Sequence, residues 1–437
     1  MINNQLVWKV MGYDIEEANN ILKDSHHLSP EEFMKWRDDK IWKIFDYHYE
    51  NNNLFRNKCN EKKSNWNDIP IMKKTDFQID LDDVLSRGYD TGNAYIANTS
   101  GSSGHPFWFA KDKLCHALAW SYLQRRYEEL NDGKSLIEAR FFGHVKGNIN
   151  LYLKEKLKDY FLKRTRFNVF DHTNEYFDQV INKFKRKPFT YIYGYSNSLL
   201  VFTDYLAKNN AETLNKICPS LKFVLLTAEL TTDEQRNYMS DIFGVPIYRE
   251  YGSSETSIIA IEDSNYQWNI ASNRLHIEIV DENDNSLPFG HRGRILITDL
   301  YNYAMPIIRY EIGDIGSLTQ TDKNPFIKLK SLDGRLSDFI SLPDGRKLPG
   351  LTFYYISRSI IESGTSIKRF IITQKKISEF VFEYVSNQEL SQSMKKNIII
   401  ESKKYLKFDV DYIFKRVKSI ADRPSGKIQH FFSEVIN

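Results

Sequence analysis

Cysteine is scarce in this sequence, and its few cysteines are isolated from one another. Cys59, Cys115 and Cys218 are the whole set, and none belongs to a Cys-x-x-Cys pair. Such an odd and sparse set excludes a disulfide framework and is typical of a reducing compartment. Apolar runs long enough to span a bilayer are missing, as is the apolar core of a signal peptide near the start. We therefore expect a cytoplasmic protein without membrane insertion.

A large excess of charge of either sign is missing as well. The 60 Lys and Arg residues face 57 Asp and Glu residues, so the net charge is only +3. This balance gives no reason to expect nucleic acid or an anionic membrane as the main partner. The short basic stretch at 183–187 is interpreted as a solvated helix end, with a phosphate-binding patch as the alternative.

The length of 437 residues is too great for one compact core and predicts at least two domains. Strands and helices alternate through the middle of the chain, which predicts an α/β fold with a mostly parallel sheet. The expected elements are a strand at 95–98, a helix at 112–130, a strand at 191–193, a helix at 196–208, a strand at 221–227, a helix at 232–243 and a strand at 245–249.

The pattern changes after Gly252. Strands at 276–280 and 293–298, joined by a turn sequence, predict antiparallel β structure. A smaller β-β-α-β pattern begins near Arg335. We therefore predict a large N-terminal domain, 1–334, with mixed, mostly parallel sheets and an antiparallel β subdomain, and a small α+β C-terminal domain, 335–437. The elements expected in the small domain are strands at 369–373 and 379–385, a helix at 390–406 and a strand at 410–420.

The first candidate site is a loop of glycine and hydroxyl residues that lies between the expected strand at 95–98 and the helix at 112–130. Its many N–H and O–H donors, with little side-chain bulk, can wrap phosphate oxygens. A flexible linker is the alternative, because most Ser/Gly runs are linkers. No Walker pattern is present. The run is Asn98-Thr99-Ser100-Gly101-Ser102-Ser103-Gly104-His105-Pro106.

A second motif, Tyr251-Gly252-Ser253-Ser254-Glu255, follows the expected strand at 245–249. An aromatic residue at a strand end can stack on a base, a hydroxyl can bond phosphate, and a carboxylate can hold Mg²⁺. The residues alone leave open a plain turn with an exposed Glu.

Three short stretches toward the C-terminus are further candidates. Asp314, after a glycine, could accept hydrogen bonds from a ribose diol, although Gly-Asp is also a common turn. Arg335 and Lys427 lie in Gly-containing stretches that usually sit on surfaces. A lysine on such a loop can also be delivered to a developing negative charge.

In order and spacing, these motifs resemble the adenylate-forming superfamily of acyl-CoA synthetases, peptide-synthetase adenylation domains and luciferases, from about Asn98 to the C-terminus. More narrowly, the chain resembles the phenylacetate–CoA ligase family and its capsule and surface-polysaccharide branch. The narrower resemblance rests on Ile69-Pro70-Ile71-Met72-Lys73-Lys74, on Tyr193-Gly194-Tyr195-Ser196, and on Thr298-Asp299-Leu300-Tyr301-Asn302-Tyr303-Ala304-Met305-Pro306 before Ile308-Arg309-Tyr310.

The resemblance implies a role for each matching position. Lys427 would bridge the attacking carboxylate and the α-phosphate, Ser254 would bond that phosphate, and Glu255 would hold Mg²⁺. Asp338 would be the hinge of a small domain that changes orientation between two half-reactions. The residues implied to bind ATP or AMP are Thr99, Ser100, Gly101, Ser102, Ser103 and Gly104 around the phosphates, Ala228, Glu229, Leu230, Tyr251 and Gly252 along the adenine, and Asp314 and Arg335 at the ribose.

Two departures from the superfamily pattern bear on the assignment. The usual Pro-Lys-Gly is replaced by Pro106-Phe107-Trp108, and the phenylacetate–CoA ligase family also lacks that lysine. Some relatives carry a Cys/His zinc site after the Glu255 position, but no cysteine follows Cys218 here. We therefore expect Mg²⁺ and no zinc, and we interpret His276 and Glu278 as a packed strand pair.

The resemblance implies an AMP-forming ligase that activates a carboxylic acid with ATP and passes the acyl group to an acceptor, with CoA as the expected co-substrate. An amine acceptor and a non-catalytic nucleotide-binding protein are the alternatives. The oligomeric state is left open by the sequence, with a homodimer as one candidate because relatives are often dimers. Phe141, Phe142 and Tyr195 could line an aryl-acid pocket or belong to the core, and the residues do not decide between the two.

Overall fold

The chain divides into two compact units in a computed structural model: residues 1–312 with 316–331, and residues 313–315 with 332–437. The second unit consists of a short segment within the long run of the first and of the chain from residue 332 onward. The structure describes residues 12–98, 107–131, 133, 136–142, 156–169, 171, 173–209, 212–321, 324–335, 339–343, 347–349, 367–406, 410–420 and 431–435.

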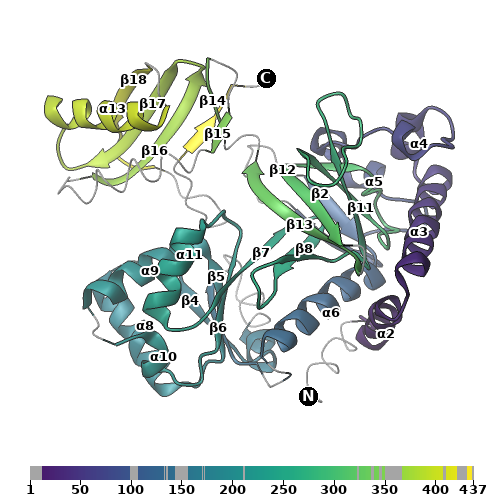
Figure 1. Cartoon of the computed structure of the whole chain (residues 1–437), viewed down its shortest axis with the longest axis horizontal. Helices are drawn as coiled ribbons and strands as arrows, with labels where there is room; N and C mark the ends of the chain where they lie inside the picture. The colour runs from purple at the N-terminus through teal and green to yellow at the C-terminus, as the bar shows by residue number, and fades with distance from the viewer. Residues whose placement is uncertain are drawn as a thin grey trace. The chain divides into compact units, whose positions relative to one another are not determined.

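One eleven-stranded sheet, counted over the described residues, organises the larger unit, in the order β10-β11-β12-β13-β9-β8-β7-β6-β5-β3-β4 (Figure 1). The pairs β4–β3, β3–β5, β5–β6 and β6–β7 are parallel. The pairs β7–β8, β8–β9, β9–β13 and β10–β11 are antiparallel. The predicted α/β fold class, with parallel and antiparallel parts, is confirmed.

The strands of this sheet have the following bounds: β3 Glu138–Phe142, β4 Arg164–Asn168, β5 Tyr191–Tyr195, β6 Phe223–Thr227, β7 Ile247–Ser253, β8 Ser257–Glu262, β9 Trp268–Ile270, β10 Leu275–Val280, β11 Arg292–Asp299, β12 Tyr310–Thr321 and β13 Asn324–Arg335. The predicted strand at 245–249 is therefore displaced and longer, because β7 continues through the Tyr-Gly-Ser motif and pairs there with β8.

The helices α8 Asn174–Arg186, α9 Ser196–Asn209, α10 Leu214–Ile217 and α11 Asp233–Phe243 accompany the parallel strands. The side chain of Thr232 accepts the Gln235 N–H at the start of α11, and Gly244 ends that helix with a left-handed φ of 71°. Phe141 of β3 stacks on Phe167 of β4 and on Phe202 of α9. These contacts place α9 on the face of the sheet that Phe141 occupies.

Helix α6, Lys113–Leu130, covers the opposite face. Side chains alternate along a strand, so Tyr191 and Tyr193 of β5 point away from the α9 side. Tyr127 of α6 lies against both rings. The parallel half is thus enclosed between α6 and the helices that follow its strands.

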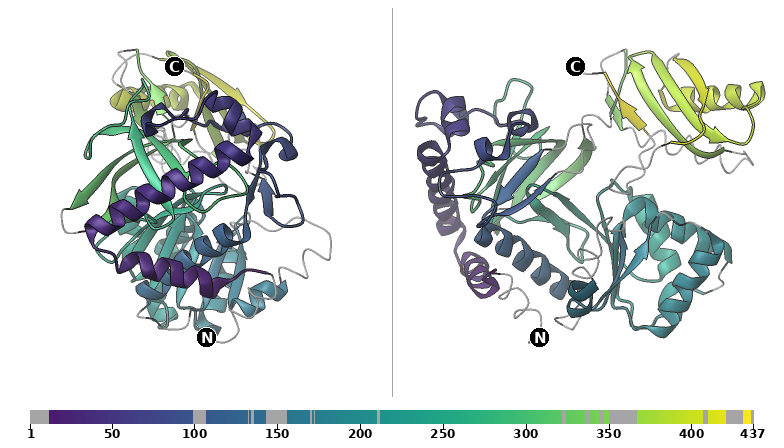
Figure 2. Two further views of the ribbon diagram at one scale, coloured as in Figure 1. Left: turned by 90° about the vertical axis from the view of Figure 1, so that its right-hand side faces the viewer. Right: turned by 180° about the vertical axis from the view of Figure 1, so that it is seen from behind.

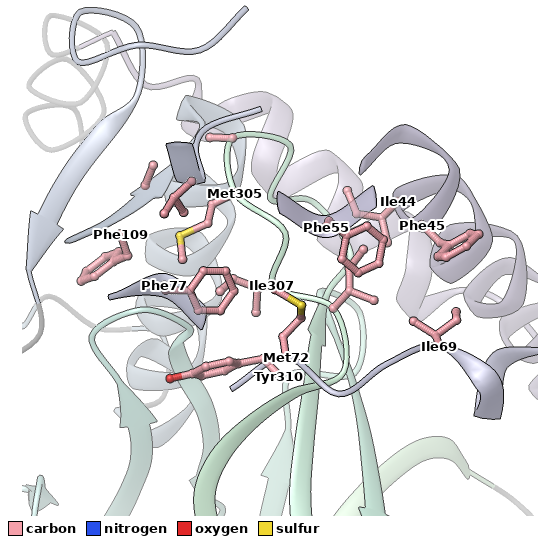
Figure 3. Close-up of a cluster of buried hydrophobic side chains, with 14 of the residues drawn as sticks. Ile44, Phe45, Phe55, Ile69, Met72, Phe77, Phe109, Met305, Ile307 and Tyr310 are labelled. Atoms are coloured by element: carbon pink, nitrogen blue, oxygen red, sulfur yellow. The ribbon is translucent and has the colours of Figure 1, made fainter. Parts of the chain in front are cut away.

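The N-terminal helices pack against the antiparallel half of the larger unit (Figures 1 and 2). They are α2 Ile15–His26, α3 Pro30–Asn51, α4 Asn53–Cys59, η1 Trp66–Asp68, η2 Lys74–Phe77 and α5 Leu81–Val84. The buried side chains of α3, α4, η2 and α5 form one cluster with the segment that leads into β12, which Figure 3 shows around Met72, Met305 and Tyr310. The short helix η2 begins after Lys73, whose main-chain N–H donates to the Asp76 carboxylate.

A separate two-stranded hairpin, β1 Tyr95–Asn98 and β2 Trp108–Lys111, precedes α6. The strands are antiparallel, and Asn98 is paired with Trp108. The sequence predicted the Ser/Gly run between a strand and the helix at 112–130. Helix α6 begins at Lys113, one residue from that prediction, but the strand β2 lies between the run and the helix.

The smaller unit has its own sheet, in the order β18-β17-β16-β19, and a separate hairpin, β14-β15. Its apolar core includes Phe370, Phe382, Ile398 and Phe431. The bounds are β14 Phe339–Ser341, β15 Lys347–Pro349, β16 Ile367–Lys376, β17 Glu379–Ser386, α13 Gln392–Leu406, β18 Asp411–Arg416 and β19 Phe431–Ser433. The predicted β-β-α-β order is present in β16, β17, α13 and β18.

Candidate adenylate-binding site

The turn between β7 and β8 carries the second motif. Gly252 lies at an irregularity in the pairing of the two strands. A Cβ atom on Gly252 would lie 2.5 Å from the main-chain oxygen of Ser257, closer than real contacts allow. Glycine is therefore required for the close approach of the two strands. At the tip Ser254 is exposed, whereas Glu255 is buried.

Lys111, the last residue of β2, supports this turn from inside the protein. Its Nζ donates to the main-chain oxygen of Ser254 at 2.8 Å and to the hydroxyl of Ser257. The side chain is almost fully buried. Burial lowers the pKa of Lys111 to about 8, with Cys115, Asp299 and Glu255 acting in the opposite direction. The ammonium form therefore still predominates at neutral pH.

A second buried cation, Arg274, holds the other end of the turn. Its guanidinium donates to the main-chain oxygens of Thr256, at 2.8 Å, and Ile258, at 2.9 Å. Asp299 at the end of β11 lies 3.6 Å from the same guanidinium and provides a counter-charge. The hydroxyls of Ser253 and Thr256 lie 2.9 Å apart across the turn. The turn is therefore fixed by side chains that come from several distant segments.

Among the described residues, Glu255 has one hydrogen-bond donor. The Tyr310 hydroxyl donates to its Oε1 at 3.0 Å. Tyr310 is buried in the cluster of Figure 3, where its ring lies beside Phe77. A carboxylate can accept about four hydrogen bonds, so within the described residues Glu255 keeps capacity for further ligands.

These contacts join the turn of the second motif to Tyr310 and to the strand that follows the Ser/Gly run. Lys111 belongs to the strand that follows the Ser/Gly run, the turn carries the second motif, and Tyr310 belongs to the stretch Arg309 to Asp314. Lys111 and Ser254 are 143 positions apart in the sequence. The Ser/Gly residues Thr99 to Gly104 themselves, and also Asp338 and Lys427, lie outside the described residues. Asp314 is buried within β12, and Arg335 is the last residue of β13.

The segment Ala228 to Leu230 follows β6 and lies over the start of α9. The Glu229 carboxylate accepts the Asn197 N–H at 3.0 Å, and the Glu229 main-chain oxygen accepts the Ser196 hydroxyl at 3.1 Å. Ala228 has a left-handed φ of 76°, which costs roughly 1–2 kcal/mol for a residue with a Cβ. The two hydrogen bonds hold this strained bend at the carboxyl end of the parallel sheet.

The three expected pocket residues do not share one face. Phe141 packs between Phe167 and Phe202 on the α9 side. Phe142 and Tyr195 lie on the α6 side, with ring centroids 4.4 Å apart. Phe142 is the last residue of β3, and Tyr195 is the last residue of β5. In the sheet, β3 lies between β4 and β5, so the chain leaves β3 toward one side and returns to β5 on the other side. Ligands of such sheets bind at this switch point, outside the carboxyl ends of the strands.

A buried hydrogen-bond network lies beside this aromatic pair. Glu250 of β7 accepts the hydroxyls of Tyr127 and Tyr193, each at 2.7 Å, and that of Thr227 at 3.0 Å. Burial raises the pKa of the Glu250 carboxyl, although the three hydroxyls act against this shift. The Arg140 guanidinium lies 5.0 Å from the centre of the Tyr193 ring and pairs with Glu138.

His276 and Glu278 lie on β10, where Glu278 is 3.3 Å from the guanidinium of Arg309. Arg309 also donates to the main-chain oxygens of Asn67 and Ile69, and so ties the segment after α4 to the sheet. Among the residues that the structure describes, no group of three or more His, Cys, Asp or Glu side chains could hold a metal ion. In the same part of the chain no helix is long and apolar enough to cross a membrane.

Comparison with known proteins gives matches along most of the chain. No family model matches it. Protein CapK of Staphylococcus aureus is 22% identical over 427 residues, which cover 91% of this chain and 88% of CapK. The crystal structure of 2-hydroxyisobutyryl-CoA ligase, in its postadenylation state with 2-HIB-AMP, covers 93% of this chain and 90% of that chain at 15% identity, with a TM-score of 0.66. The chain has the fold of the adenylate-forming ligases.

A second structure with the adenylate-forming fold is similar over a smaller share of the chain. ATP-bound MatB from Rhodopseudomonas palustris covers 76% of this chain and 66% of that chain at 13% identity, with a TM-score of 0.50. The predicted superfamily is thus confirmed at the level of the fold. The narrower resemblance to the capsule branch is supported only weakly, by the match to CapK at 22% identity.

Several residues of this adenylate-forming fold were missed in the sequence. Lys111 had one usable signal, since it ends the otherwise apolar run Phe107-Trp108-Phe109-Ala110. Arg274 and Glu250 had none, because a charged residue looks the same in sequence whether it is solvated or buried in a network. Tyr310 was part of a quoted motif but received no role.

Proposed function

We propose that this protein activates a carboxylic acid as its acyl-adenylate with ATP, releasing pyrophosphate, and then passes the acyl group to CoA. One observation carries the proposal: β2, the Ser254–Glu255 turn and Tyr310 meet around a single carboxylate with spare capacity. The strand that follows the Ser/Gly run thereby contacts the turn that the resemblance assigns to the α-phosphate. The adenylate-forming fold supports the same conclusion.

Magnesium is part of this proposal, and the donor set around Glu255 fits it. Mg²⁺ is a hard cation that usually binds one or two carboxylates together with substrate phosphates and water. Glu255 offers a buried carboxylate with one hydrogen bond from Tyr310. Bound there, the ion would neutralise phosphate charge. No larger ligand cluster is needed, since the nucleotide would supply the remaining oxygens.

The chain's own groups would mainly position the reactants. The Ser254 hydroxyl, which is exposed, would bond the α-phosphate. Tyr251 and the Ala228–Leu230 bend would border the adenine, and Asp314 and Arg335 would hold the ribose. Lys427 would approach the α-phosphate from the smaller unit, with Asp338 as the hinge. Such positioning and charge neutralisation account for most catalysis of phosphate chemistry.

The acid itself is proposed to bind at the switch point, against Phe142 and Tyr195. Their rings are 4.4 Å apart, and Tyr195 is buried with its pKa raised to about 12 by burial and by the nearby Glu229. The hydroxyl thus stays neutral. A neutral aromatic pair favours an acid with an apolar or aromatic body. Phe141 is left out of this proposed pocket because it lies on the other face.

The test is a panel of carboxylic acids in a pyrophosphate-release assay, followed by AMP release with and without CoA. Acid-dependent pyrophosphate release that CoA accelerates through to AMP is the expected outcome. Release without any response to CoA would redirect the second half-reaction to an amine acceptor. Absence of acid-dependent release across a broad panel would refute the adenylation proposal and favour a non-catalytic nucleotide-binding protein.

A further inference from the structure

Lys111 is a buried lysine that no part of the adenylation chemistry above uses. It ends β2, and its Nζ has two acceptors on the β7–β8 turn, the Ser254 main-chain oxygen and the Ser257 hydroxyl. Burying a lysine is costly unless the charge is hydrogen-bonded. A lysine kept at this position therefore calls for an explanation, since an apolar side chain would pack against Phe109 and Ala110 at lower cost.

The first contact fixes the orientation of the peptide group between Ser254 and Glu255. A trans peptide is planar, so its oxygen and its N–H point in opposite directions. The structure has no cis peptide bonds among the described residues. Because the Ser254 oxygen points inward to Lys111, the Glu255 N–H points to the other side of the turn. Arg274 fixes the orientation of the peptide group between Thr256 and Ser257 in the same way, by donating to the Thr256 main-chain oxygen.

The second contact fixes the far end of the turn. Ser257 has a left-handed φ of 60°, an uncommon conformation for a residue with a side chain. Its hydroxyl is bound by the lysine that also binds Ser254. The ammonium group thus spans the turn and holds both ends of the segment that contains Glu255.

We propose that Lys111 is a positioning residue for nucleotide binding, which holds the Ser254–Ser257 turn so that Glu255 and the Glu255 N–H face the phosphates of MgATP. The inference rests on the proposed function. It also explains how the hairpin that contains the Ser/Gly run is kept beside the turn. The ammonium does not touch the reacting atoms.

The experiment compares MgATP and AMP binding by isothermal titration calorimetry, without any carboxylic acid present, in the full chain. Lys111→Met keeps the apolar stem and removes the charge. We expect the dissociation constant of MgATP to rise about tenfold or more, since hydrogen bonds to charged groups are among the strong ones. Binding of AMP, which lacks the β- and γ-phosphates and needs no metal, should weaken less.

Two further variants separate positioning from a general loss of stability. Ser257→Ala removes one acceptor and keeps the charge, so it should weaken MgATP binding in the same direction by a smaller factor. Tyr122→Phe is the matched control: it removes a buried hydrogen bond to the Asn269 main-chain oxygen, away from the turn. It should lower the melting temperature and leave both dissociation constants unchanged.

Each outcome decides the question. Wild-type-like MgATP binding by folded Lys111→Met would overturn the inference, as would equal weakening of MgATP and AMP. If Lys111→Met does not fold, Ser257→Ala decides, and an unchanged MgATP affinity in that variant overturns the inference. Failure of the wild type to bind MgATP would instead refute the proposed function.

Discussion

The two halves of the eleven-stranded sheet bury polar groups in different ways. In the parallel half Glu250 accepts three hydroxyls and has no ion pair within 4 Å among the described residues. In the antiparallel half Glu255 accepts the Tyr310 hydroxyl, its one hydrogen bond among the described residues, and lies near the buried cation Lys111. The protein supplies three hydrogen bonds to the Glu250 carboxylate, whereas the Glu255 carboxylate keeps unused acceptor capacity. Burial alone therefore does not distinguish the two glutamates, whereas unused acceptor capacity on a fixed turn does.

The largest effect on activity is expected from a substitution of Glu255, the carboxylate with unused acceptor capacity. Glu255→Gln keeps the shape and removes the charge that would bind Mg²⁺. Acid-dependent pyrophosphate release should fall by about 10²–10³, the usual cost of one lost charge-stabilising group. The measurement is pyrophosphate release over a Mg²⁺ titration, with wild type as control. A variant with a normal rate and a normal Mg²⁺ requirement would show that the metal binds elsewhere.

A loss of similar size is expected from the smaller unit. Lys427→Ala should slow adenylate formation by at least about 10², yet leave MgATP binding largely intact, because the lysine is assigned to the reacting carboxylate and α-phosphate. Single-turnover kinetics together with calorimetry separate the two quantities. Near-normal adenylation by Lys427→Ala would mean that the lysine has been misassigned.

Glu250→Gln tests the buried carboxylate of the parallel half, and it should affect catalysis less than the substitutions at Glu255 and Lys427. A carboxamide cannot accept from all three hydroxyls, so the free energy of unfolding should fall by about 1–3 kcal/mol. The kcat of adenylation should stay close to that of wild type, while the KM for the acid should rise because Tyr193 and Thr227 border the proposed acyl pocket. Denaturant unfolding and steady-state kinetics measure both. A collapse of kcat with normal stability would contradict the structural role of Glu250.

Acid should destabilise the larger unit through its buried histidines. Burial lowers the pKa of His48 to about 4, and those of His116 and His276 to about 3. A depressed histidine pKa contributes stability above pH 6.5 that is lost as the pH falls through the folded value. For His48 the loss is on the order of 3 kcal/mol by pH 4.

Asp112 opposes this trend, because burial raises its pKa to about 6 and its contribution therefore grows as the pH falls below that value. Three histidines should outweigh one aspartate. Urea unfolding between pH 7.5 and 4.5 measures how the free energy of unfolding changes with pH, and His48→Gln should make this dependence weaker. An unfolding free energy that does not change over this range would contradict the burial argument.

Much of the architecture could be predicted from the sequence because it is set by local patterns. The strand at 223–227, helix α11 with its Gly244 end, and the β16-β17-α13-β18 order all follow from apolar periodicity and turn residues. The hairpin β1–β2 was missed, since four residues of β2 are too few to show a period. The overall superfamily followed from motif order, which no single motif would have established.

The site could be predicted only in part, because its geometry depends on long-range contacts. Tyr251 to Glu255 were found as a motif, but their support by Lys111, Arg274 and Tyr310 comes from positions far away in the sequence. The pocket prediction combined Phe141 with Phe142, although neighbouring residues of a strand point to opposite faces. That alternation was available from the sequence and would have removed Phe141.

The hairpin β1–β2 pairs with no other strand in the described part of the chain. A two-stranded ribbon is marginally stable by itself, so it should open locally more often than the eleven-stranded sheet. Its amide hydrogens should then exchange with solvent faster than those of β6 or β7. If nucleotide binds to the run that connects its strands, protection of Tyr95 to Asn98 should rise on adding MgATP. The hairpin would serve as a built-in, label-free reporter of occupancy, readable by mass spectrometry before any substrate acid has been identified.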